Sequence, residues 1–195
     1  MVPLILLASL LVTIDLRSMD GAMSARLLRG IRSETTTIWR PYGVEIRWVG
    51  GREEVAVVDV ALTALIERRA LPPAESHLVA LGRVHLRIDL QTDEPIRLSY
   101  RAVAELLDRR PSDRRALATR FQGFADVEMG RALGRVLAHE VGHVLLGAPF
   151  HRPTGLMRPR FTADELASPD RAPFVLTAGD LARLRSRFDR GGAGW

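Results

Sequence analysis

The sequence predicts an α+β fold in which a mixed, twisted sheet packs on two long helices. Short segments before residue 100 alternate apolar and polar side chains, which is the pattern of half-buried strands. Two longer segments, one near each end of the chain, have the 3.6-residue periodicity of core helices. No linker rich in Pro, Gly or Ser divides the 195 residues, so we expect one domain with one hydrophobic core.

The N-terminal third of the chain contains a strand, a helix and a second strand. Residues 11–16 predict the first strand, and a polar turn follows it. Apolar residues at helical spacing then predict a helix that ends near Trp39, before Pro41 and Gly43. Residues 44–49 alternate cleanly, which places their even-numbered side chains on one buried face.

The middle of the chain predicts further strands and two short helices. Residues 55–60 are typical of a buried strand, and residues 61–70 can form a helix before a Pro-Pro break. Alternation predicts strands within residues 77–90 and over residues 96–100. An amphipathic pattern predicts a helix over residues 101–110.

Residues 127–146 predict a core helix that carries two histidines near its end. His139 and His143 are four residues apart, so both imidazoles project from one face of this helix. Gly147 stands where a helix C-cap is expected, so the chain can turn back after the second histidine. Three of the five histidines in the chain fall between His139 and His151.

The segment from His139 to His143 has the HExxH pattern of zinc hydrolases. One Zn²⁺ can bind both imidazoles, and Glu140 is then placed beside the metal-activated water as a general base. His151, in the loop after the helix, is the candidate third ligand. The alternative is a pair of core histidines without a metal, but a helix that stops soon after its second histidine favours the metal site.

A longer motif includes a downstream glycine, a third histidine and a methionine turn. Its members occur in this order: His139, Glu140, His143, Gly147, His151 and Met157. This order resembles the metzincin zinc peptidases, and most closely their small bacterial and archaemetzincin-like forms. The spacing departs from the family, because Gly147 lies four residues after His143 instead of three and His151 lies eight instead of six. Archaemetzincins also carry a second zinc site built from cysteines, which this cysteine-free chain lacks.

The resemblance implies a zinc-dependent peptidase with a zincin-like domain over residues 10–190. In that interpretation His139, His143 and His151 bind Zn²⁺, and Glu140 is the general base. Met157 forms an apolar floor beneath the histidines. The substrate is a peptide or protein, and an edge strand, supplied by residues 85–90 or 96–100, pairs with its extended backbone.

Two other interpretations remain open. In gluzincin-type peptidases a glutamate on a later helix completes the zinc site, and Glu165 lies at a suitable distance along the chain. Alternatively, the chain is a catalytically inactive zincin-like scaffold that serves as an interaction module.

Composition disfavours nucleic acid as a partner. The formal net charge is +5 and all basic residues are arginine, but the arginines are scattered along the chain. Aromatic residues make up 6%, so no stacking platform for bases is expected.

Residues 2–12 form an almost unbroken apolar run. The run is too short for a stable membrane span and fits either an export signal or a buried strand. We expect residues 1–9 to be a clipped leader that runs into the fold, which favours a secreted or periplasmic protein over a cytoplasmic one. A capped last helix is predicted from Thr177 to Phe188, and residues 191–195 are predicted to be a flexible tail.

Overall fold

A five-stranded mixed sheet forms one layer of the molecule. The computed structural model describes residues 9–50, 58–69, 71, 80–86, 94–110 and 122–188. Its strands are β1 (Leu10–Ser18), β2 (Val44–Val49), β3 (Val60–Glu67), β4 (Gly82–Arg83) and β5 (Ile96–Ser99). Their order in the sheet is β2-β1-β3-β5-β4, and only β4, at one edge, runs antiparallel to its neighbour.

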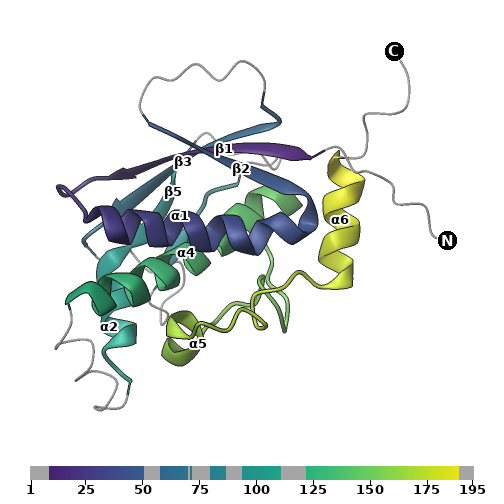
Figure 1. Cartoon of the computed structure of the whole chain (residues 1–195). Helices are drawn as coiled ribbons and strands as arrows, with labels where there is room; N and C mark the ends of the chain where they lie inside the picture. The colour runs from purple at the N-terminus through teal and green to yellow at the C-terminus, as the bar shows by residue number, and fades with distance from the viewer. Residues whose placement is uncertain are drawn as a thin grey trace.

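Helices cover one face of this sheet. They are α1 (Ala25–Trp39), the 3₁₀ turn η1 (Arg40–Tyr42), α2 (Tyr100–Leu107), α4 (Gln122–Leu146), α5 (Ala163–Ala167) and α6 (Ala178–Phe188). Figure 1 shows α1 and α4 lying beneath the sheet, with α2 and α5 below them and α6 near the start of β1. Among the described residues, no helix is long and apolar enough to cross a membrane.

The structure contains the two predicted long helices as α1 and α4. It also contains the first two predicted strands as β1 and β2, and the predicted last helix as α6.

The register of the parallel strands explains where the core lies. Val12 pairs with Ile46 on one side, and Ile14 pairs with Leu62 on the other. These even-numbered residues share one face of the sheet and are buried against the helices. The hydrophobic core therefore lies between the sheet and the two long helices.

α1 and α4 pack closely because glycines stand at their contact. A Cβ atom on Gly134 would lie 2.9 Å from the carbonyl oxygen of Ile31, which is closer than real Cβ contacts occur. The Thr35 hydroxyl donates a hydrogen bond of 3.0 Å to the Gly134 carbonyl across the same contact. α4 is therefore held against α1 along the stretch that precedes the histidines.

The prediction of a helix over residues 61–70 is wrong, because most of this segment belongs to β3. Leu62, Ala64 and Ile66 are buried and alternate with more exposed neighbours, which is the period of a strand. β3 also has parallel partners on both sides, β1 and β5. Pairing on both edges overrides the weak helix propensity of this Ala- and Leu-rich segment. Of the predicted strand at residues 55–60, residues 55–57 lie outside the described residues and only Val60 is in a strand.

The edge strand beside the long helices also differs from expectation. Residues 96–99 form β5, which lies between β3 and β4 and is not an edge strand. The edge is β4, which begins three residues before the predicted segment 85–90, and residues 87–90 lie outside the described part of the chain. Alternation along a strand reports which side chains are buried, but it carries no information on the order of strands in a sheet.

A buried ion pair connects α1 and α4 to the C-terminal third of the chain. Arg135 is fully buried, and its Nε lies 2.8 Å from a carboxylate oxygen of Glu34. The other carboxylate oxygen of Glu34 binds Arg171 at 2.7 Å. Arg135 also donates to the carbonyl oxygens of Glu165 and Asp170. Its guanidinium therefore attaches the segment after the histidine loop to both long helices.

Replacing Glu34 with alanine is expected to destabilise the fold by about 3–5 kcal/mol, because the Arg135 guanidinium would remain buried without its counter-charge. Chemical denaturation measures this change. Glu105→Ala is the matched control: it removes an exposed ion pair with Arg101 and should change stability by less than about 1 kcal/mol. Equal effects of the two substitutions would contradict the structural role of the buried pair.

Candidate metal centre

Two histidines one helical turn apart on α4 face each other at the centre of the site. His139 and His143 are both buried, with 6% and 7% of their surfaces exposed. Their Nε2 atoms lie 3.1 Å apart. Because α4 is packed against α1 and the sheet, the core holds the stretch of backbone that carries both rings.

Backbone carbonyl groups determine which nitrogen of each ring carries the proton. His139 Nδ1 lies 2.7 Å from the carbonyl oxygen of Leu156, and His143 Nδ1 lies 2.6 Å from that of Ala148. A carbonyl oxygen can only accept, so each Nδ1–H donates and each Nε2 of the neutral ring keeps its lone pair. Two lone pairs therefore point at one another across 3.1 Å with no proton between them.

His151 comes to the same point from the loop after α4. Its ring centroid lies 5.2 Å from that of His139 and 5.0 Å from that of His143. One nitrogen from each of the three rings falls within 4.8 Å of the others. His151 is exposed, so the group of three opens to solvent on this side.

The loop after α4 brings His151 to the site although His151 lies eight residues after His143, two more than in the metzincin pattern. Gly147 has a left-handed φ of 54° and ends α4 at the predicted position. Arg183 on α6 donates to the carbonyl oxygens of Leu146 and Gly147, which satisfies the end of the helix. The Arg152 amide donates to the Met157 carbonyl at 2.7 Å and closes the loop that carries His151.

The electrostatic environment keeps all three rings neutral. Burial, together with the neighbouring histidines, lowers the pKa of His139 to about 3. Burial also lowers the pKa values of His143 and His151 below their usual range. Near neutral pH the site therefore offers uncharged nitrogen donors, which is the form that binds a metal ion.

Met157 packs against α4 at Gly142, where the glycine makes room for it. A Cβ atom on Gly142 would lie 2.4 Å from the Met157 sulfur and 3.5 Å from the Trp39 ring. Met157 itself is 1% exposed. The glycine between the two histidines therefore allows the methionine side chain to pack against the helix backbone.

Glu140 lies on the side of α4 that faces β4. Its carboxyl group is buried, accepts a hydrogen bond from the Val84 amide and lies near the Arg83 guanidinium. Burial is the largest influence and raises the pKa of Glu140 to about 8, although the Val84 hydrogen bond and Arg83 act in the opposite direction. A carboxyl group tuned to this range can exchange a proton near neutral pH.

Glu165 is not a member of the group formed by the three imidazoles. Its carboxylate accepts hydrogen bonds from Thr162 in a capping box at the start of α5, and it pairs with Arg158 at 2.9 Å. The group of described side chains that could hold a metal ion consists of histidines alone. Glu165 thus acts in the structure as a helix cap and ion-pair partner.

Several groups at the site have no signal in the sequence. The carbonyl groups of Leu156 and Ala148 act through the backbone, so their residue types carry no information. Phe161 packs its ring edge-to-face with His139 at 5.6 Å, and the sequence offers no spacing rule that links these two residues.

Comparisons with known proteins support the fold but not a specific family. No protein-family model matches the chain, and no curated protein matches it. Among solved structures, the chain is similar to an archaemetzincin from Methanopyrus kandleri, with a TM-score of 0.55 and 16% sequence identity. The match covers 96% of this chain and 100% of that one. The chain has an archaemetzincin-like fold. The α+β, zincin-like architecture predicted from the sequence is confirmed.

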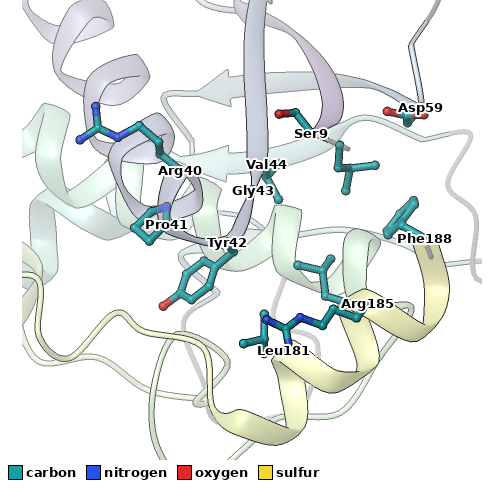
Figure 2. Close-up of a pocket in the computed structure, with 12 residues that line it drawn as sticks. Ser9, Arg40, Pro41, Tyr42, Gly43, Val44, Asp59, Leu181, Arg185 and Phe188 are labelled. Atoms are coloured by element: carbon teal, nitrogen blue, oxygen red, sulfur yellow. The ribbon is translucent and has the colours of Figure 1, made fainter. Parts of the chain in front are cut away.

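A separate cavity of about 490 Å³ lies away from the histidines, near the start of β1. Figure 2 shows Tyr42 from η1 on one side and Leu181, Arg185 and Phe188 from α6 on the other. None of its lining residues belongs to the histidine group. Tyr42 accepts a hydrogen bond of 2.8 Å from the Leu176 amide, so this region joins η1 to the segment before α6.

Gly142→Ala is expected to destabilise the protein by about 1–3 kcal/mol, because the added methyl group overlaps the Met157 sulfur. Thermal or denaturant unfolding of the metal-free protein measures the effect. Gly179→Ala on α6 is the control, since its Cβ would meet nothing closer than 3.9 Å. The control should be neutral or slightly stabilising, and an equally harmless Gly142→Ala would show that Met157 is not packed there.

Proposed function

We propose that the chain is a zinc-dependent peptidase. The observation that supports this most strongly is the convergence of three neutral imidazoles, two of which have their Nδ1 protons committed to carbonyl groups. Three histidine nitrogens are a common protein ligand set for catalytic zinc, which keeps a further position open. His139, His143 and His151 would hold the ion.

The donor set fits zinc better than a hard cation. Mg²⁺ and Ca²⁺ prefer carboxylate and carbonyl oxygen ligands, and no carboxylate belongs to this group in the described part of the chain. The carbonyl groups behind His139 and His143 are the outer hydrogen-bond partners that orient metal-binding imidazoles. When bound, zinc would supply Lewis acidity that polarises a carbonyl group and lowers the pKa of a water molecule.

Glu140 is the proposed general base. Its carboxylate would accept a proton from the water that attacks the peptide carbonyl carbon. It would then deliver that proton to the amine nitrogen as the C–N bond breaks. Because burial raises the pKa of Glu140 to about 8, positive charge bound at the neighbouring histidines would favour the ionised form that this role requires.

A peptide is the proposed substrate because of the sheet edge beside the site. β4 forms one edge of the sheet and lies against α4 at Glu140. An extended peptide can bind along such an edge by strand addition, which would bring its backbone carbonyl groups past the histidines. The similarity of fold to an archaemetzincin agrees with this proposal.

The third zinc ligand can be tested by comparing two substitutions. His151→Ala should weaken zinc binding by more than the roughly 10–100-fold typical of a change outside the ligand set, because it removes a donor nitrogen. Glu165→Ala should leave zinc affinity nearly unchanged. Competition with a chromophoric chelator measures both values. The reverse result would support a gluzincin-type site instead.

Glu140→Gln tests the catalytic role. It should lower turnover of a dye-quenched casein substrate by about 10²–10⁴-fold while zinc remains bound, because glutamine cannot accept the water proton. Glu105→Gln, an exposed change on α2, is the matched control and should have full activity. If the wild-type protein binds zinc but cleaves neither casein nor a mixed peptide library, the chain is a non-catalytic scaffold.

A further inference from the structure

β4 crosses α4 directly over Glu140, and a glycine stands at the crossing. A Cβ atom on Gly82 would lie 2.7 Å from a methyl carbon of Val136 and 2.8 Å from Glu140 Oε1. It would also lie 3.0 Å from Glu140 Cγ. The space that the Glu140 side chain occupies therefore exists only because residue 82 has no side chain.

The pairing of β4 shows where its backbone groups point. Gly82 is opposite Leu98, and the Ser99 amide donates to the Leu81 carbonyl at 2.9 Å. In an antiparallel pair, hydrogen-bonded and non-hydrogen-bonded residues alternate. Residues 81 and 83 therefore direct their backbone groups to β5, and the groups of Gly82 point out of the sheet edge. Val84 directly follows β4, and continuing the same alternation would turn its amide outward as well.

The outward amide of Val84 has a partner in the helix below. Gly82, two residues before it, closely approaches Glu140 Oε1, and the Val84 amide acts on the same carboxyl group as a hydrogen-bond donor that lowers its pKa. An edge amide is ordinarily free for water or for an added strand. Here it holds a side chain of the neighbouring helix at the open edge of the sheet.

We propose that Gly82 and Val84 are positioning residues for Glu140: the glycine leaves room for the carboxyl group, and the Val84 amide orients it at the sheet edge. This inference rests on the proposed function, because it identifies the residues that hold the general base of that reaction in place. A peptide that adds to the edge cannot pair with the Val84 amide unless it displaces Glu140. A substrate strand that leaves Glu140 in place therefore pairs with backbone groups of the edge other than the Val84 amide.

The contact can be tested in the metal-free protein by amide hydrogen exchange. In Glu140→Ala the Val84 amide should exchange at least about 10-fold faster than in the wild type, because it loses its acceptor. The Ser99 amide is the internal control, since its acceptor is the Leu81 carbonyl and should be unaffected. An unchanged Val84 exchange rate would overturn the proposal, whether or not the protein is a peptidase.

The functional part is tested with Val84→Pro, which deletes the amide hydrogen. Proline is tolerated at a sheet edge where the lost N–H points outward, so the pairing with β5 should persist. In the zinc-loaded protein, Val84→Pro and Gly82→Ala should each lower kcat for dye-quenched casein by about 10–100-fold. KM and zinc affinity should stay within about twofold of the wild type, since only the orientation of the base is affected.

Val84→Ala is the matched control, because it shortens the side chain but keeps the amide, and it should retain near-wild-type kcat. Full activity of Val84→Pro, or an equal loss in Val84→Ala, would overturn the positioning role. A zinc-loaded wild type that cleaves no substrate would overturn the proposed function instead. In that case the exchange experiment still decides whether the Val84 amide binds Glu140.

Discussion

The site depends on two imidazole nitrogens that face each other with lone pairs at 3.1 Å. Neither ring can relieve this approach by moving a proton to Nε2, because both Nδ1 protons are donated to carbonyl groups. Burial also disfavours the charged imidazolium form, so near neutral pH neither ring gains a second proton that could form a hydrogen bond between the two Nε2 atoms. A bound cation satisfies both lone pairs at once. The rest of the structure can be understood as the scaffold that maintains this arrangement.

Three separate contacts maintain it. The glycine-mediated packing of α1 on α4 holds the helix that carries both histidines. The buried Glu34–Arg135 pair attaches the C-terminal segment, whose Leu156 carbonyl orients His139 and whose Met157 packs under Gly142. β4 encloses the opposite side, where Glu140 meets the sheet edge. Helix packing thus supports His139 and His143, the buried ion pair supports the segment after the histidine loop, and the sheet edge supports Glu140.

The sequence predicts where the histidines of this site lie better than it predicts the sheet beside them. The HExxH spacing and the helix stop at Gly147 are local signals, so they place His139, Glu140 and His143 on one helix end without further information. The helix predicted for residues 61–70 fails because pairing on both edges of β3 is a non-local effect. Likewise, no pattern in the sequence indicates that β4 is the edge strand or that the Val84 amide contacts Glu140, since both follow from strand order and backbone direction.

Zinc K-edge X-ray absorption of the zinc-loaded full chain is the most direct measurement of the central claim. The account predicts one zinc ion coordinated by three imidazole nitrogens at about 2.0–2.1 Å, with the remaining position taken by a light-atom ligand such as water. A spectrum with two imidazoles and a carboxylate would contradict His151 as the third ligand. Failure of the folded chain to retain zinc would contradict the metal site itself.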